Sequence, residues 1–238
     1  MTDSTRAYEG GELELFRHAR NWKAYIAERL RPYLNGDVVE VGAGLGAFTA
    51  ALCNTSARTW CCLEPDPAMA EHLVRYVESG EFPVACRVCN VMLADLPREQ
   101  VFDTILYIDV LEHIEDDRAE LAEAARRLNP GGFLVVLSPA HQWLYSPFDR
   151  AIGHFRRYEA REASGITPPG LTLTSALYVD SVGLLAMIAN KLLLRSSMPT
   201  LRQVLIWDRL MVPLSRLVDR MFLGRLGRSI LFIWRCDA

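Results

Sequence analysis

The 238-residue sequence contains no apolar run of the roughly 20 residues that a membrane-spanning helix needs, and its polar start carries no cleavable signal pattern. It also contains no internal repeat and no low-complexity tract. Half of its residues are hydrophobic, so the chain can bury one sizeable core, but it is short for two independent domains. We therefore expect one domain, residues 1–238, in the cytoplasm.

The cysteines do not form a pattern that binds metal or carries redox chemistry. There are six of them, and Cys86 and Cys89 have the CxxC spacing. Both fall in a predicted strand, and no second pair completes a zinc site. Cysteines in such positions usually behave as small buried hydrophobic residues. The sequence therefore predicts no metal centre.

The net charge is small, but the charged residues are unevenly distributed. The net charge is −3. Residues 1–182 hold 17 Lys and Arg against 26 Asp and Glu, so this part is acidic. Residues 183–238 hold 9 Lys and Arg against 3 Asp and Glu, so this part is basic. An acidic body without a basic face does not suit the phosphates of a nucleic acid. We expect no nucleic-acid partner, and the basic end raises the question of what it contacts.

The most informative segment is residues 38–49, which read VVEVGAGLGAFT. A β-branched strand, an acid and a glycine turn precede the start of a helix, and glycines let the backbone approach a ligand where a Cβ would collide. A nicotinamide or flavin dinucleotide could use such a turn. Glu40 disfavours one, because a carboxylate there repels a pyrophosphate, whereas the ammonium and sulfonium groups of S-adenosylmethionine are cationic.

Three later segments follow in order. Strand-like residues 59–63 end at Glu64, about 20 residues after the first glycine, where an acid can accept both ribose hydroxyls. Residues 102–114 read FDTILYIDVLEHI and residues 128–137 read LNPGGFLVVL. In this order and spacing, over about residues 36–138, the motifs resemble those of the class I S-adenosylmethionine-dependent methyltransferases. The resemblance implies a transferase whose cofactor is S-adenosyl-L-methionine.

Strands and helices alternate along the chain, which indicates a doubly wound α/β sheet. The resemblance implies a Rossmann-like, mostly parallel sheet of seven strands with an antiparallel last strand. We assign residues 1–35 to an N-terminal helical cap, 36–180 to the core, 181–227 to a helical insertion and 228–238 to the last strand. The expected helices are Glu12–Tyr33, Ala47–Asn54, Pro67–Ser79, Glu115–Leu128, Val182–Leu194 and Leu201–Phe222, the last kinked at Pro213. The expected strands are Asp37–Val41, Arg58–Leu63, Pro83–Val88, Val101–Ile108, Phe133–Leu137, Leu171–Val179 and Arg228–Arg235.

The resemblance also assigns the cofactor contacts. The residues expected around the methionine portion, with Glu40 near its ammonium group, are Glu40, Gly42, Ala43, Gly44, Gly46 and Asp109. Glu64 should bind the ribose, and Pro65 and Asp66 should shape the adenine wall. Many family members place an acid after the third strand for the adenine amino group. The alternatives that this chain offers there are Asn90, Val91, Met92, Leu93 and, slightly later, Asp95.

The acceptor site should follow the fifth strand, where ligands meet the carboxyl ends of such a sheet. Residues 138–158, with FD, then GH, then RRY, resemble a bacterial subgroup of the ubiquinone-type small-molecule methyltransferases. His154 is the preferred general base and His141 the second, because imidazole titrates near neutral pH. Arg157 and Tyr158 either donate hydrogen bonds to an oxygen-rich acceptor or pin the loop to the domain through Asp149 and backbone carbonyls.

These features predict methyl transfer to a small or lipid-like acceptor, at oxygen rather than at nitrogen or carbon. A base is needed only where the acceptor is a weakly acidic hydroxyl. Residues 108–111 read IDVL in place of the NPPY-type tetrapeptide of enzymes that methylate amino groups of nucleic acids or glutamine, so RNA or protein is the weaker alternative. Glu112 and His113 are expected to cap or brace the next helix.

The insertion, residues 181–227, has three alternative roles: a lid over the acceptor, a homodimer interface, or a peripheral contact at the inner face of a membrane. It holds 7 Lys and Arg against 2 Asp and Glu. Basic amphipathic helices can lie in a lipid interface. The residues expected to form one apolar stripe are Trp207, Met211, Leu214, Leu217 and Met221.

Overall fold

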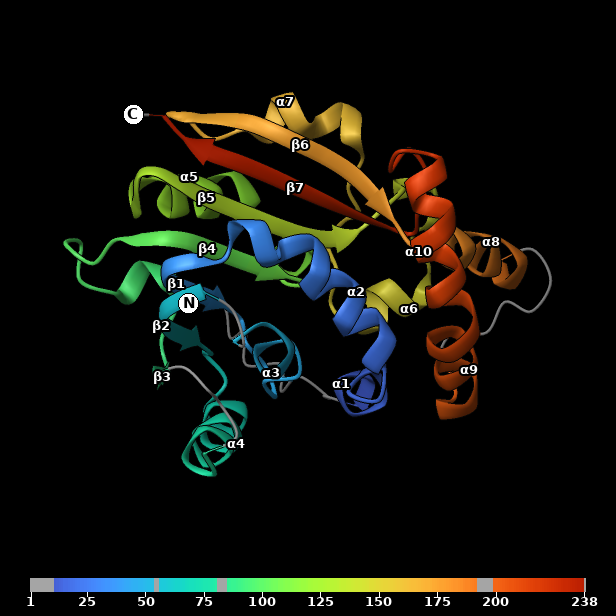
Figure 1. Cartoon of the computed structure of the whole chain (residues 1–238), viewed down its shortest axis with the longest axis horizontal. Helices are drawn as coiled ribbons and strands as arrows, with labels where there is room; N and C mark the ends of the chain where they lie inside the picture. Colours follow the sequence, from blue (N-terminus) through green and yellow to red (C-terminus); the bar gives the residue numbers. More distant parts are fainter. Residues whose placement is uncertain (1–10, 54–55, 81–84, 192–198, 238) are drawn as a thin grey trace.

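The computed structural model describes residues 11–53, 56–80, 85–191 and 199–237. Its centre is one seven-stranded sheet in the order β3-β2-β1-β4-β5-β7-β6 (Figure 1). β7 runs antiparallel to β5 and β6, and the other paired strands are parallel. This arrangement confirms the predicted fold class. The strands are β1 (Asn35–Val41), β2 (Ser56–Leu63), β3 (Ala85–Cys89), β4 (Phe102–Ile108), β5 (Leu128–Pro139), β6 (Leu171–Val179) and β7 (Ser229–Cys236).

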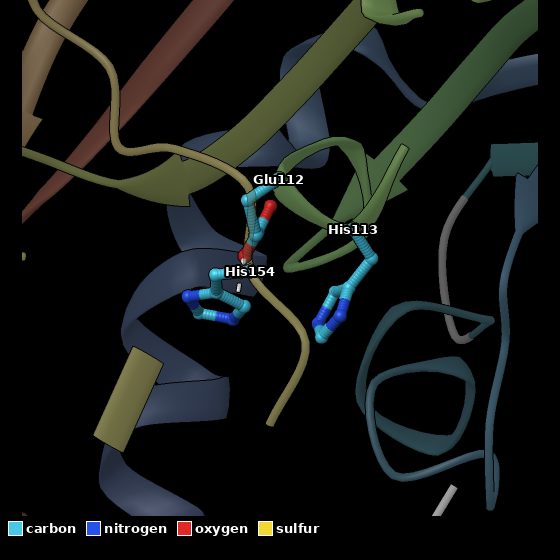
Figure 2. A group of neighbouring side chains, drawn as sticks. All are labelled: Glu112, His113 and His154. Atoms are coloured by element: carbon cyan, nitrogen blue, oxygen red, sulfur yellow. Dashed lines mark ion pairs between the residues drawn. The ribbon is translucent and has the colours of Figure 1, made fainter. Parts of the chain in front are cut away.

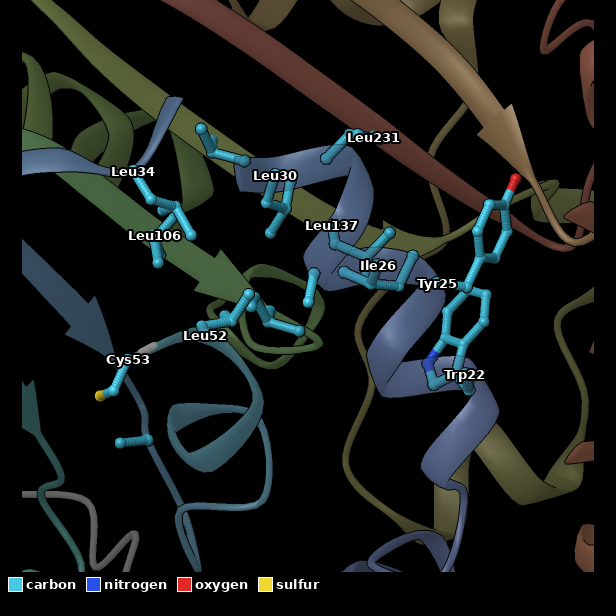
Figure 3. Packing of buried hydrophobic residues seen from close by; sticks show 14 of the residues in the cluster. Trp22, Tyr25, Ile26, Leu30, Leu34, Leu52, Cys53, Leu106, Leu137 and Leu231 are labelled. Carbon is cyan, nitrogen blue, oxygen red and sulfur yellow. The ribbon is translucent and has the colours of Figure 1, made fainter. Parts of the chain in front are cut away.

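Helices cover both faces of the sheet, because successive strand residues such as Val38 and Val39 belong to two separate buried clusters. On one face, α2 directs Ile26 and Leu30 toward Leu137 of β5 (Figure 3). The helices are α1 (Gly11–Phe16), α2 (Arg20–Leu30), α3 (Thr49–Leu52), α4 (Pro67–Glu78), α5 (Asp117–Arg126), α6 (Pro147–Ala151), α7 (Ala163–Ile166), α8 (Ser181–Ala189), α9 (Leu201–Ile206) and α10 (Val212–Met221). No helix in the described part of the chain is long and apolar enough to cross a membrane.

The prediction of a single helix over Glu12–Tyr33 is wrong. The chain leaves the helical conformation between α1 and α2, and a 3-10 turn at Arg31–Tyr33 follows α2. Asp208 of the insertion accepts hydrogen bonds from the backbone amides of Asn21 (3.2 Å) and Trp22 (2.9 Å). Amides in the first turn of a helix have no partner within it. A carboxylate far along the chain therefore stabilises the start of α2.

The helix predicted over Leu201–Phe222 is also interrupted. A π-helical segment, Trp207–Met211, separates α9 from α10. Pro213 has no N–H to donate to the carbonyl four residues earlier, and the helix widens just before it. Trp207 does not belong to the exposed apolar stripe that the sequence predicted, because it is buried and its Nε1 donates to Asp180 at 2.7 Å.

Smaller differences concern the ends of elements. The helix predicted over Ala47–Asn54 is reduced to the single turn of α3, and β5 begins five residues before its predicted start at Phe133. β6 has the predicted bounds, Leu171–Val179. Asn54, Pro83, Val84 and residues 192–194, which the predictions included, lie outside the described residues.

Candidate active site

The turn after β1 requires glycine. Gly42, Gly44 and Gly46 all have positive φ angles, of 66°, 55° and 76°. A Cβ on Gly42 would lie 2.7 Å from Cγ2 of Val110, and one on Gly46 would lie 2.5 Å from Cδ1 of Leu73. Glycine at positions 42 and 46 thus lets the turn pack closely against Val110 and Leu73.

The two acids expected at the cofactor both brace the turn. The Glu40 carboxylate accepts from Oγ1 of Thr49 (2.7 Å) and Nε1 of Trp60 (3.0 Å), and burial raises its pKa to about 7. Glu64 accepts from the amides of Gly44 (2.7 Å) and Asp66 (2.9 Å), and burial raises its pKa as well. Their contacts with the ammonium group and the ribose stay predictions. A bound cation would favour the charged form of Glu40 and lower its pKa again.

The residues predicted at the adenine ring surround the ends of β2 and β3. Asn90 ties the two ends together, because its Nδ2 donates to the carbonyls of Glu64 (2.8 Å) and Pro65 (3.0 Å). Met92 is exposed, and Asp95 accepts from its amide at 3.1 Å. Asp95 thus closes this short turn, and the residue that contacts the adenine amino group stays a prediction.

Asp109 follows β4 with a positive φ of 53°; the residue as a whole is open to solvent, but protein atoms crowd its carboxyl group. This loss of solvation raises the pKa of Asp109 to about 6, and the positive charge of Arg228 opposes that rise. Sequence reasoning missed Arg228, which lies 2.9 Å from Asp180 and 4.0 Å from the centre of the Trp207 ring. The sequence offered only one of several arginines near the end of the insertion as a signal. Arg228 is thus held by Asp180, and its charge acts on Asp109.

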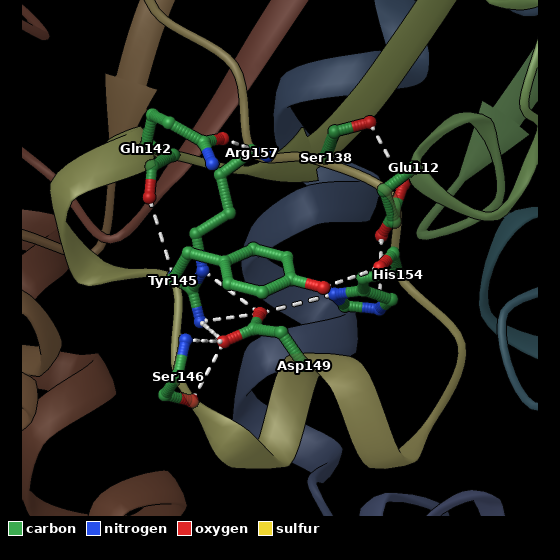
Figure 4. A network of polar contacts seen from close by, with 9 residues as sticks. Glu112, Ser138, Gln142, Tyr145, Ser146, Asp149, His154 and Arg157 are labelled. Carbon is green, nitrogen blue, oxygen red and sulfur yellow. Dashed lines mark hydrogen bonds and ion pairs between the residues drawn. The ribbon is translucent and has the colours of Figure 1, made fainter.

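A hydrogen-bond network around Asp149 organises the loop after β5 (Figure 4). Asp149 is fully buried and accepts from Ser146, from Nε (2.8 Å) and Nη2 (3.0 Å) of Arg157, and lies 3.0 Å from Nδ1 of His154. Burial alone would raise the pKa of Asp149, but the hydrogen bond from His154 and the charge of Arg157 outweigh it and lower the pKa to about 2. Asp149 is therefore an anion that fixes the orientation of the His154 ring.

Three side chains that can bind metal meet beside this network (Figure 2). One ligand atom each of Glu112, His113 and His154 lies within 4.8 Å of the others. Burial and the charge of Asp109 raise the pKa of Glu112 well above its usual value, and its Oε1 has no hydrogen-bond partner among the described residues. Burial lowers the pKa of His113 to about 4. One carboxylate and two imidazoles suit a first-row divalent ion, a set that the sequence had not predicted.

The other proposed catalytic residues have structural contacts. His141 stacks on Tyr178, with ring centres 4.8 Å apart, and its Nε2 lies 3.0 Å from the carbonyl oxygen of Gly227. The Tyr158 hydroxyl is buried and donates to Asp117 at 2.8 Å. With Arg157 bound to Asp149, these contacts are those of residues that pin the loop. Their catalytic roles stay predictions.

Comparison with known proteins identifies the core of the chain. Residues 39–136 match a methyltransferase domain family. The demethylmenaquinone methyltransferase of Tropheryma whipplei (strain Twist) is 30% identical over 148 residues, 61% of this chain and 60% of that protein. The ubiquinone biosynthesis O-methyltransferase of Bradyrhizobium sp. (strain ORS 278) is 27% identical over 106 residues, 44% of this chain and 41% of that protein. The chain thus matches about half of the length of these relatives.

Solved structures share the fold. Coclaurine N-methyltransferase bound to N-methylheliamine and SAH superimposes with a TM-score of 0.61 at 13% identity, over 91% of this chain and 72% of that one. At this identity the likeness speaks for the fold and not for the acceptor.

Proposed function

We propose that this chain, whose residues 39–136 match the methyltransferase domain family, transfers a methyl group from S-adenosylmethionine to an oxygen atom of a small or lipid-like acceptor. One observation carries this proposal. The glycine turn after β1 and the Asp149–His154 pair lie at the same edge of the sheet, on either side of Asp109. Asp109 follows β4, which lies between β1 and β5 in the sheet, so it separates the two loops.

The residues at the turn fit S-adenosylmethionine. Glycines with positive φ at positions 42, 44 and 46 let the main chain of the turn approach a ligand, and the carboxylates of Glu40 and Glu64 favour a cationic ligand over a pyrophosphate. Relatives named for demethylmenaquinone and ubiquinone biosynthesis support a quinone-like acceptor, and the O-methyltransferases among them support transfer to oxygen.

When bound, S-adenosylmethionine supplies a methyl carbon that its sulfonium group activates. The protein must hold the acceptor oxygen about 3 Å from that carbon and in line with the bond that breaks. In the tautomer whose Nδ1–H donates to Asp149, Nε2 of His154 is left to take the proton of an acceptor hydroxyl. Arg157 holds Asp149, so the imidazole keeps its orientation.

Titration calorimetry with S-adenosylhomocysteine and with NAD tests the donor. We expect binding of the first alone. Glu64→Ala should weaken this binding by about 10-fold or more, because two ribose hydroxyls lose a charged acceptor. Glu78→Ala, on the exposed end of α4, is the matched control. NAD binding without a response to S-adenosylhomocysteine would overturn the proposal.

Isotopically labelled S-adenosylmethionine tests the acceptor. The protein is incubated with catechol and hydroquinone compounds, with and without a prenyl tail, and the products are analysed by mass spectrometry. We expect label on oxygen. Label on nitrogen or carbon, or incorporation only into added RNA or protein, would contradict the proposed acceptor while leaving the donor assignment intact.

A further inference from the structure

The insertion turns both of its acidic residues inward. Asp208 and Asp219 are 2% and 1% exposed. Asp208 holds the start of α2, and Asp219 accepts from the Tyr25 hydroxyl (2.6 Å) and from the amides of Asp180 (2.7 Å) and Ser181 (3.0 Å). These bonds fasten α10 to α2 and to the end of β6. The acids are therefore not available to balance charge on the outer surface.

The opposite side of the same helices is apolar and exposed. Its side chains recur at intervals of three or four residues, so they lie on one face, and they are 42% to 72% exposed. A run of this kind on a soluble domain marks a surface that contacts something else. The members of this outer face are Ile206, Leu210, Leu214, Leu217 and Met221.

Basic side chains flank the outer face. Arg202, Arg209 and Arg225 are exposed, and none has an ion pair with any residue in the described ranges. Arg216 and Arg220 pair with Glu28 of α2, the latter at 3.1 Å. The exposed charges that the insertion itself contributes in the described ranges are therefore all positive.

The insertion also contacts the loop of the candidate active site. α9 and α10 stand beyond the end of the sheet toward which β4 and β5 point (Figure 1). Lys191, after α8, donates to the carbonyl of Trp143 and lies 5.6 Å from the centre of its ring. The carbonyl of Gly227, at the other end of the insertion, lies 3.0 Å from Nε2 of His141. The insertion that carries the outer face thus contacts the loop after β5 through Lys191 and Gly227.

We propose that the outer face of α9 and α10 docks on an anionic lipid surface. Leucine, isoleucine and methionine side chains enter the boundary between headgroups and acyl chains, and the arginines contact the anionic headgroups. A symmetric dimer through this face would bring the arginines of two copies together, where their charges repel. A lipid-like acceptor would then reach the candidate site from the membrane, a consequence that rests on the proposed function. Docking itself does not depend on it.

Co-sedimentation with vesicles tests the docking without donor or acceptor. The full chain is mixed with phosphatidylcholine vesicles and with vesicles that contain 30% phosphatidylglycerol, a composition of about one anionic lipid in three. We expect binding at least about 10-fold stronger to the anionic vesicles, weakened by salt. The triple variant Arg202→Gln, Arg209→Gln, Arg225→Gln should lose about 10-fold or more of that binding. The control is a second triple variant, which removes the same number of charges from exposed positions outside the insertion: Arg98→Gln, Arg118→Gln, Arg161→Gln. It should bind to the vesicles like the wild type.

The apolar contribution is tested with Leu210→Ser, Leu214→Ser, which should weaken vesicle binding while circular dichroism and melting temperature stay near the wild type, since both side chains are exposed. Equal binding of both vesicle types, or equal loss in the two arginine triple variants, would overturn the proposal. So would absence of vesicle binding together with a dimer, seen by analytical ultracentrifugation, that the leucine variant dissociates.

Discussion

The two ends of the candidate active site are built from different parts of the chain. At the end proposed to bind the cofactor the main chain makes the shape: the amides of Gly42 and Ala43 donate to the carbonyl of Leu63 at 2.8 and 3.0 Å, and three glycines have positive φ. At the acceptor end, buried charged side chains make it, with Asp149 between Arg157 and His154.

This difference determines how each end fails. A main-chain turn tolerates most side-chain changes, but not a Cβ where φ is positive and a neighbour is close. A buried charge network depends on every member, because removing one leaves another unpaired in a region of low polarity. The following substitutions test this contrast.

Arg157→Met should have the largest effect, a loss of about 3 to 5 kcal/mol in the free energy of unfolding, because Asp149 would stay buried without its cation. Urea denaturation measures it. The double variant Arg157→Met, Asp149→Asn should be more stable than the single one, since it removes both charges. A single variant that loses less than about 1 kcal/mol would show that Asp149 is satisfied by its other partners.

His154→Ala should lower turnover by about 100-fold with nearly unchanged cofactor affinity, because a positioned base is lost. The residual rate should rise with pH as the acceptor ionises without help. His72→Ala, exposed on α4, is the control. If Tm and KM change together and the pH profile keeps its shape, His154 is a structural residue.

Gly42→Ala and Gly80→Ala separate backbone strain from close approach. Both glycines have positive φ, so backbone strain should cost each variant about 1 kcal/mol of stability, and the clash at position 42 should add to this loss. Only the Cβ at position 42 meets a neighbour, Val110 at 2.7 Å, whereas nothing lies within 4 Å of one at position 80. We expect the affinity for S-adenosylhomocysteine to fall by about 10-fold in the first variant alone. Equal affinities would mean that the turn is not the cofactor site.

His113→Gln should have the smallest effect and one that depends on pH. The pKa of His113 is lowered from 6.5 to about 4, so the folded state favours its neutral form. The preference for the neutral form contributes to the free energy of unfolding. That contribution is fully present above pH 6.5 and is lost as the pH falls toward 4. Because the ring is partly exposed, we expect a difference of about 1 kcal/mol between pH 7 and 4 in the wild type relative to the variant. Parallel stability curves for the two proteins would contradict the assignment.

The sequence predicted the glycine turn after β1 but not the cluster of side chains that can bind metal after β4 and β5. The turn at 42–46 and Glu64 come from a short stretch in which each residue's role depends on its neighbours. The cluster of Glu112, His113 and His154 joins two segments about 40 residues apart, and neither segment alone indicates a set of ligands. Arg228 and Asp180, 48 residues apart, likewise meet only because β6 and β7 pair in the sheet.

Local pattern determined the order of strands and helices, the glycine turn and the bounds of β6, because alternation, helical spacing and the freedom of glycine act over a few residues. Tertiary structure decided the rest. Asp208, far along the chain from α2, accepts a hydrogen bond from the Trp22 amide at the start of that helix. Trp207 donates to Asp180 and is therefore buried, although its spacing predicted a place in the apolar stripe. A buried carboxylate must find donors wherever the fold brings them, and this requirement outweighs the preferences of any single segment.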